Sequence, residues 1–172
     1  MTAKPLPSAS ELARLFSYDE RRGVLLWKHR DECPRHWNSR LAGKVAGKVD
    51  VRGRRIVNIG GLYYPAHRII FKLFTGEEPP QIDHIDGNPS NNRIANLRPA
   101  TPSQNSQNQR RAKNNSTGFK GVSVQTRDRK FRARIAAGGK RHELGIFETA
   151  EDAACAYRKA SARFHGSFAR PT

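Results

Sequence analysis

A polar and basic run at residues 106–117, SQNQRRAKNNST, divides this chain of 172 residues into two parts. The run contains no acidic residue, and we interpret it as a linker. The hydrophobic fraction of 36% is low for one large globule and fits two small cores better. We therefore expect a first domain at 1–109 with a β-rich N-terminal extension, a basic linker at 110–117 and a second domain at 118–172.

The chain is strongly basic. Lys and Arg number 32 against 15 Asp and Glu, which gives a formal net charge of +17. This charge is far above what solubility alone requires of a chain of this size. We therefore expect a polyanionic partner, a nucleic acid in preference to an acidic membrane surface.

Cysteine usage and hydropathy narrow the class further. Cys33 and Cys155 form no Cys-x-x-Cys pair, which argues against a thiolate zinc site and excludes a disulfide framework. No apolar run approaches the ~20 residues of a membrane span. The N-terminus lacks the apolar stretch of a signal peptide. We expect a cytoplasmic protein with no membrane partner and no small-molecule cofactor.

Hydrophobic periodicity and turn residues predict the elements of the first part. Residues 30–42 are polar and irregular and allow no assignment. The expected elements are a helix at 8–17 with Ser10 as its N-cap, a strand at 24–28, a glycine-punctuated hairpin or three-stranded meander at 44–64, and a helix at 66–74 ended by Gly76.

The segment at 81–109, QIDHIDGNPSNNRIANLRPATPSQNSQNQ, holds the residue types that phosphodiester cleavage needs. Histidine is the natural base for deprotonating a water near neutral pH. Carboxylate and amide oxygens are the natural ligands of a hard divalent cation that offsets the phosphate charge. Asp83 and His84 are adjacent, so in an extended segment their side chains point to opposite faces and local curvature is needed for one shared site.

Two asparagines follow the Asp-His pair. Asn96 lies in the same turn-rich segment. A helix is predicted to begin at Pro102, with Thr101 as its N-cap, and would carry Asn105 on its first turns. Asp-His or an Asp-Gly-Asn turn alone is a weak signal, and the acid spacing departs from that of a calcium-binding EF-hand loop.

The string IDHIDGNPSNNRIANLRPATPSQNSQN, together with the upstream PAHRIIFKLFTGEEPP, closely resembles the HNH nuclease family, in particular its phage and homing-endonuclease branch. The resemblance covers roughly residues 40–109. It implies a β-hairpin and helix around one divalent metal, with His84 as the general base and Asp83 and Asn105 as metal ligands. It also implies that Asn96 braces the loop that orients His84. Asn105 stands at the third position of the HNH motif, where many relatives have histidine. An asparagine oxygen at that position favours Mg²⁺ or Mn²⁺ over zinc.

On this resemblance the chain is a metal-dependent endonuclease that acts on double-stranded DNA as a monomer or weak dimer. The implied setting is the cytoplasm of a bacterial host cell, for an enzyme of a phage or mobile element. His67, on the helix before the hairpin, is left open between a packing role and a direct role in the site. We interpret His29, His36 and His165 as structural.

In the second part, the sequence predicts three strands, at 121–128, 129–138 and 140–148. It also predicts one helix at 150–164 with Thr149 as its N-cap. Residues alternate between apolar and basic along the middle strand, so one sheet face is expected to be basic. The apolar face would be covered by the helix, whose alanines and aromatic residues recur at helical spacing.

This segment, with GFKGVSV, KFRARI and GKRHELGIFETAEDAACAYRKASARFHGSFAR, closely resembles the plant Apetala/ethylene-response-factor DNA-binding domain over about residues 116–170. Plant members carry Trp and further Arg at several of the matching positions, so their target sequence is not carried over. The positions that the resemblance places toward DNA are Ser123, Gln125, Arg127, Lys130, Arg132, Arg134, Arg141 and Glu143.

The expected fold class is α+β: a ββα-metal HNH nuclease domain, followed by a small three-stranded antiparallel sheet packed on one helix. Two other functions compete with the nuclease. A non-catalytic DNA-binding transcriptional regulator would not require His84 and both proposed ligands. An RNA-binding or RNA-cutting protein would be expected to carry the aromatic motif of common RNA-binding modules, which this chain lacks.

Overall fold

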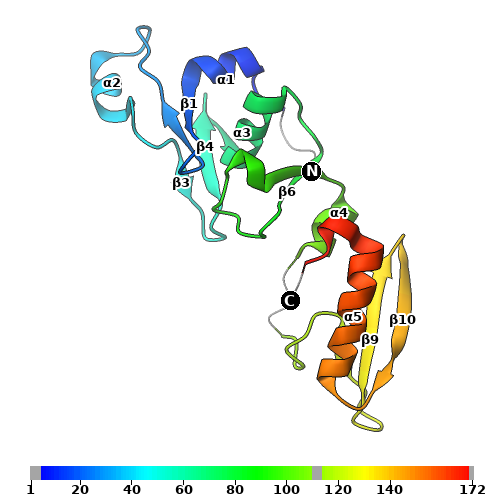
Figure 1. The fold of residues 1–172 in the computed structure, drawn as a ribbon. Coiled ribbons are helices and arrows are strands. Elements are labelled where there is room, and N and C mark those ends of the chain that lie inside the picture. Colours follow the sequence, from blue (N-terminus) through cyan, green and yellow to red (C-terminus); the bar gives the residue numbers. More distant parts are fainter. Residues whose placement is uncertain (1–4, 110–113, 171–172) are drawn as a thin grey trace. The chain divides into compact units, whose positions relative to one another are not determined.

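The computed structural model describes residues 5–109 and 114–170. The chain forms two compact units, Met1–Thr101 and Pro102–Thr172 (Figure 1). Each unit has its own hydrophobic core. The fold is mixed α/β with small antiparallel sheets. The first unit ends at Thr101, whereas the sequence predicts a domain boundary after residue 109. Residues 110–113 of the expected linker lie outside the described residues.

The first unit contains three antiparallel sheets, ordered β1-β2, β3-β4-β5 and β6-β7. Their helices and strands follow one another with short connections. In chain order the elements are α1 (Ala9–Leu15), β1 (Phe16–Asp19), β2 (Val24–Trp27), α2 (Arg35–Leu41), β3 (Lys48–Val49), β4 (Arg55–Ile59), β5 (Leu62–Pro65), α3 (Ala66–Thr75), β6 (Gln81–His84), the 3-10 helix η1 (Ile94–Asn96) and β7 (Leu97–Ala100).

Three local assignments differ from the sequence prediction, the first being that Phe16 and Ser17 begin strand β1 and do not end the first helix. Ser8, not Ser10, caps α1: its hydroxyl accepts from the Glu11 N–H at 3.2 Å, and the Glu11 carboxylate accepts from the Ser8 N–H at 2.8 Å. This reciprocal capping box satisfies two donors at once, which Ser10 cannot do because its N3 residue is not acidic. Helix α2 occupies the stretch that allowed no assignment, and its Asn38 side chain bonds the backbone N–H and C=O of Arg30.

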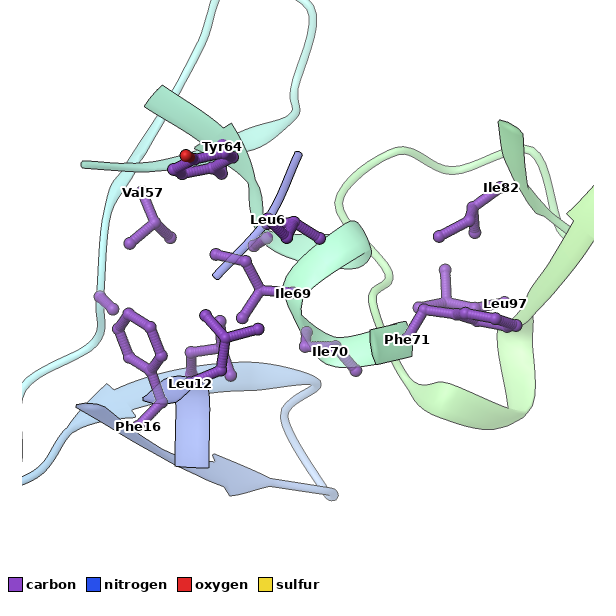
Figure 2. Close-up of a cluster of buried hydrophobic side chains, with 13 residues drawn as sticks. Leu6, Leu12, Phe16, Val57, Tyr64, Ile69, Ile70, Phe71, Ile82 and Leu97 are labelled. Carbon is purple, nitrogen blue, oxygen red and sulfur yellow. The ribbon is translucent and has the colours of Figure 1, made fainter. Parts of the chain in front are cut away.

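Helix α3 lies at the centre of the first core. Ile69 and Ile70 are fully buried, and Phe71 is nearly so. Figure 2 shows Leu12 and Phe16 beside this helix and, on its other side, Ile82 and Leu97 from the β6-β7 hairpin. The helix ends where Gly76 adopts the left-handed conformation, as its sequence position predicts. The hairpin is therefore fixed to the rest of the unit by its own apolar side chains.

The second unit contains α4 (Pro102–Gln107), β8 (Val122–Val124), β9 (Phe131–Ala137), β10 (Lys140–Phe147), α5 (Ala150–His165) and the 3-10 helix η2 (Gly166–Phe168). The sheet order is β10-β9-β8, and all pairings are antiparallel. The Thr149 hydroxyl accepts from the Asp152 N–H at 3.1 Å, which confirms the predicted N-cap of α5.

Helix α5 covers one face of this sheet, with Ala133 from β9 and Ala153 and Ala154 from α5 at the centre of the core. The approach is closest at Gly121, where a Cβ atom would lie 2.1 Å from the Tyr157 ring and 2.8 Å from the Arg134 carbonyl oxygen. Gly121 also has φ +74°, so glycine is required there for two independent reasons.

Cys33 and Cys155 are free thiols. Within the described ranges, no helix has the length and apolar character needed to cross a bilayer.

Candidate active site

The β6-β7 hairpin positions the Asp-His pair. Asp83 lies opposite Arg98, and His84 lies opposite Leu97. Ile82 and Leu97 enter the core, and this fixes the register because a slip by one residue would exchange the two faces of the strand. Asp83 is only 4% exposed, while His84 is partly exposed.

Asp83 pairs with Arg98 across the hairpin. The Arg98 Nε donates to Asp83 Oδ2 at 2.9 Å, and Nη2 donates to the same oxygen at 2.7 Å. The two side chains are 5% and 15% exposed. Burial of a carboxylate is unfavourable unless it is paired and hydrogen-bonded, and Arg98 provides both interactions. The sequence prediction did not include Arg98, although the hairpin register alone would place it opposite Asp83.

The His84 ring is held by Asn92. Nε2 of His84 lies 2.9 Å from Asn92 Oδ1, and Asn92 is 2% exposed. Tyr18 of β1 supports this loop, because its hydroxyl donates to the Asn92 carbonyl at 3.2 Å and accepts from the Ile94 N–H at 2.9 Å. The imidazole therefore has a fixed plane before any substrate is present. Asn92 is not among the site residues that the sequence predicts; its position in the turn-rich segment indicates a turn residue or an amide that contacts a phosphate.

Asn96 holds the loop that follows His84. Its Oδ1 accepts from the Asp86 N–H at 3.0 Å, and its Nδ2 donates to Asp86 Oδ1 at 3.0 Å and to the Asn91 carbonyl at 2.8 Å. Burial alone would raise the pKa of the Asp86 carboxyl. Hydrogen bonds from Asn88, Asn91 and Asn96 together have the larger, opposite effect, so the pKa of Asp86 is lowered. The position of Asn96 is compatible with the bracing role that the resemblance implies.

His67, from the first turn of α3, lies against His84. The two ring centroids are 5.1 Å apart, with an interplanar angle of 71°. Burial, reinforced by the positive charges of His84, Arg68 and Arg54, lowers the pKa of His67 to about 3. His67 is therefore neutral at physiological pH and places an uncharged ring beside His84.

The fourth residue of the expected site, Asn105, lies on α4 in the second unit. Neither unit alone contains both Asn105 and Asp83. The pairing of these residues around one ion therefore stays a prediction.

The donor chemistry near the hairpin fits a hard cation. The described residues include no group of three or more His, Cys, Asp and Glu that could hold a metal ion. Magnesium does not require such a group, because it is commonly bound by one or two carboxylates and completes its shell with water and phosphate oxygens. Asp83 and Asn105 each carry oxygen donors of the type that magnesium prefers.

Within the strands of the second unit, Ser123, Arg132, Arg134, Arg141 and Glu143 share one sheet face, whereas Arg127 and Lys130 lie in the connection between β8 and β9. Ser123, Arg132 and Ile146 align across the three strands, and Arg134 lies opposite Glu143. Three of the basic side chains have partners within the sheet region. Arg132 Nη2 donates to Gln125 Oε1 at 3.0 Å, Arg134 Nε lies 3.3 Å from Glu143 Oε1, and Lys130 Nζ lies 2.5 Å from Glu148 Oε1.

Three further predicted DNA-binding positions, Ser123, Arg127 and Arg141, are exposed to solvent.

His165, interpreted from the sequence as structural, is buried. Its Nε2 lies 3.0 Å from the Ala136 carbonyl oxygen, so it connects the end of α5 to β9.

The buried Asp83, the partly exposed His84 and the loop held by Asn96 all lie within residues 81–100 of the first unit. Residues 64–107 match the family described as HNH endonuclease, and the chain belongs to that family. It is 42% identical over 89 residues to "Protein 3.8" of Escherichia phage T7, an alignment covering 52% of this chain and 73% of the relative.

A second relative is the "Uncharacterized HNH endonuclease L560" of Acanthamoeba polyphaga mimivirus, 37% identical over 108 residues. That alignment covers 61% of this chain and 55% of the relative, so the chain spans about half the length of that protein. No solved structure matches the chain significantly. The protein is thus an HNH endonuclease with phage and viral relatives, and nucleases of this family generally use a divalent metal ion.

Proposed function

We propose that this protein hydrolyses phosphodiester bonds in double-stranded DNA in a divalent-metal-dependent reaction, with His84 as the general base. The observation that carries the proposal is the fixed His84 ring, bonded by the buried Asn92 and adjacent in sequence to the buried Asp83. This arrangement lies within the segment that matches the family.

His84 would take a proton from the attacking water as its oxygen bonds to phosphorus. The bond from phosphorus to the 3′ oxygen then breaks, which leaves 5′-phosphate and 3′-hydroxyl ends, as the family resemblance implies. A base held in one orientation contributes both the correct protonation state and the correct aim. Asn92 fixes the ring directly, and Asn96 fixes the loop that carries Asn92.

Asp83 and Asn105 would hold the divalent ion, with Mg²⁺ preferred and Mn²⁺ as the alternative. When bound, such an ion offsets charge on the phosphate and stabilises the leaving oxygen. Arg98 keeps the Asp83 carboxylate in place through two bonds to Oδ2.

The sheet of the second unit would bind the duplex through its basic face, in the manner of an Apetala/ethylene-response-factor domain. Some DNA-binding proteins read the major groove with the strands of a β-sheet. Arg132 and Arg134 are already oriented by Gln125 and Glu143, which reduces the entropy lost on contacting phosphate. We further propose that the protein is a homing-type nuclease encoded by a phage or another mobile element.

A plasmid-nicking assay tests the proposal. With Mg²⁺ the wild-type protein should convert supercoiled plasmid to nicked or linear forms, and EDTA should stop the reaction. His84→Ala should lower the rate by about 10²–10⁴-fold, while its circular dichroism spectrum stays that of the wild type. Undiminished cleavage by His84→Ala would remove His84 from the mechanism. Tight duplex binding without cleavage under either metal would favour the non-catalytic regulator.

A further inference from the structure

A second basic element lies against the loop next to His84. This element is the β3-β4 turn, residues 50–54. The Ser90 hydroxyl, from the loop that also carries Asn92, donates to the Gly53 carbonyl oxygen at 2.6 Å. A Cβ atom at Gly53 would lie 3.3 Å from Ser90 Oγ and 3.5 Å from Pro89 Cγ, so the turn and the loop are in direct contact.

The β3-β4 turn is rigid. Asp50 Oδ1 accepts from the Arg52 N–H at 2.8 Å and from the Arg54 N–H at 2.9 Å. The backbone N–H groups of Asp50 and Gly53 donate to the carbonyls of Arg54 and Asp50, at 2.8 and 3.0 Å. The hydrogen bond from the Arg54 backbone is the largest cause of a lowered pKa at Asp50, which keeps this carboxylate charged and the turn closed.

The turn presents residues that the first core does not use. Val51 is fully exposed at the tip, and Arg52 is exposed beside it. The Arg54 side chain is 39% exposed and its Nε lies 3.4 Å from Asp50 Oδ2. Val51 therefore contributes nothing to the first core, and Arg52 and Arg54 lie close to it in sequence. This combination suits a DNA duplex, because Arg side chains bind phosphates and apolar side chains can contact or wedge between bases in a groove.

The location connects the turn to the chemistry. The loop that contacts Gly53 through Ser90 also carries Asn92, which bonds the His84 ring. We propose that the β3-β4 turn binds the DNA beside the cut, with Arg52 and Arg54 on backbone phosphates and Val51 against the groove. The inference rests on the proposed nuclease function and assigns this turn the task of holding the cleaved segment at His84, separately from the sheet of the second unit.

Binding measurements in EDTA test the phosphate contacts without cleavage. Fluorescence anisotropy with a labelled duplex would compare the wild type with the double variant Arg52→Ala/Arg54→Ala over a range of salt concentrations. Removing one phosphate contact should reduce the slope of log affinity against log salt by about one. The double variant Arg14→Ala/Arg40→Ala removes the same charge from exposed positions on α1 and α2, and Arg52→Lys/Arg54→Lys restores it in place. Equal decreases in slope for both alanine pairs would overturn the inference.

Cross-linking tests the position of the turn on DNA. Val51→Cys, in a background of Cys33→Ser and Cys155→Ser, would be modified with an azidophenacyl group and photolysed on a duplex spanning a mapped nick. Cross-links should fall within one helical turn, ~10 base pairs, of the nick. Cross-links beyond that distance, or none while a probe at Arg132→Cys does react, would overturn the inference.

The two proposals fail differently. If the wild-type protein nicks DNA and the turn variants match it in salt slope, the nuclease stands and the turn has no DNA role. If the wild-type protein does not nick DNA but the turn variants have a reduced slope, DNA binding by the turn stands and the nuclease proposal fails.

Discussion

His84 obtains its orientation from one buried amide. Asn92 is 2% exposed and reaches Nε2 of His84 at 2.9 Å, so the ring cannot turn freely about its Cβ–Cγ bond. A base that must be re-aimed at every encounter spends most of its time in unproductive orientations, which is why groups supporting a reactive side chain affect rate without touching substrate.

Asn92→Ala should therefore reduce the maximal nicking rate by about 10–100-fold, the range typical of removing a supporting group from a metal-dependent site. Duplex binding in EDTA should be unchanged. Asn88→Ala, in the same loop but exposed, provides the matched control. Equal rates in Asn92→Ala and the wild type would show that the hydrogen bond does not orient the base.

His67 makes the first unit sensitive to acid. Its pKa is about 3 in the fold against an ordinary value of 6.5, because burial disfavours the charged ring. The unfolded chain takes up the proton first as pH falls, so the contribution of neutral His67 is complete above pH 6.5 and is lost progressively below it. The loss is at most about 1.4 kcal/mol per pH unit.

His67→Phe should accordingly show a smaller decrease in unfolding free energy between pH 7 and pH 5 than the wild type. Both tryptophans, Trp27 and Trp37, belong to the first unit, so their fluorescence in urea follows this unit alone. His36→Gln, at an exposed position, should keep the wild-type pH dependence. Parallel decreases in wild type and His67→Phe would contradict the assignment.

At the residue scale, the sequence predicts which residues belong to the candidate site, but it does not predict the side chains that contact them. Asp83, His84, Asn96 and Asn105 stand out because carboxylate, imidazole and amide recur at spacings typical of one family. The residues that hold these side chains in place do not stand out in the sequence. Asn92 sits in an Asn-Asn pair that is typical of a turn, and Tyr18 lies far away in sequence. Arg98 becomes visible only once the hairpin register is known.

At the scale of elements, the close packing of β8 and β9 against α5 depends on an absent side chain. Gly121 approaches the Tyr157 ring so closely that even a methyl group would overlap it. By contrast Gly138, in the turn between β9 and β10, has φ +57°, and a methyl group added there would meet no atom within 4 Å.

Gly121→Ala should destabilise the second unit by roughly 3 kcal/mol or more, from overpacking together with an unfavourable backbone conformation. Gly138→Ala should cost about 1 kcal/mol, because only the backbone conformation is unfavourable there. Far-UV circular dichroism in urea would measure both, with tryptophan fluorescence confirming that the first unit is unaffected. Similar costs for the two variants would mean that the sheet and helix separate easily.

The elements that the sequence predicts well are those whose apolar residues follow a period. The strands β8, β9 and β10 alternate, and α3 and α5 repeat at helical spacing, so each appears where the pattern indicates. Helix α2 escapes sequence prediction because it contributes no large residue to the core. It is held instead by Asn38 on the Arg30 backbone and by the Arg30 guanidinium 4.1 Å from the centre of the Trp37 ring.

At the scale of the whole molecule, a net charge of +17 requires that the effect of any one basic face be separated from the general attraction to DNA. Arg132→Ala/Arg134→Ala should reduce the slope of log affinity against log salt by about two and leave metal-dependent nicking at low salt in place.

The matched control is Arg158→Ala/Lys159→Ala, which removes two charges from exposed positions on α5. Anisotropy titrations of the three proteins on one duplex, at several salt concentrations, provide the comparison. The sheet face is misassigned if the two double variants behave alike.

The core shared by α3 and the β6-β7 hairpin has a consequence for biosynthesis. Its buried members run from Leu6 to Leu97, and the hairpin supplies Ile82 and Leu97 to it. A nascent chain that has not yet released Leu97 from the ribosome lacks one strand of the hairpin and the cross-strand partner of Asp83. At ~5–20 residues per second, translation therefore passes through a period in which Asp83 and His84 have been made but are not yet held in place. A chain stopped before Leu97 lacks β7 altogether, so the hairpin that would orient the proposed site residues cannot form.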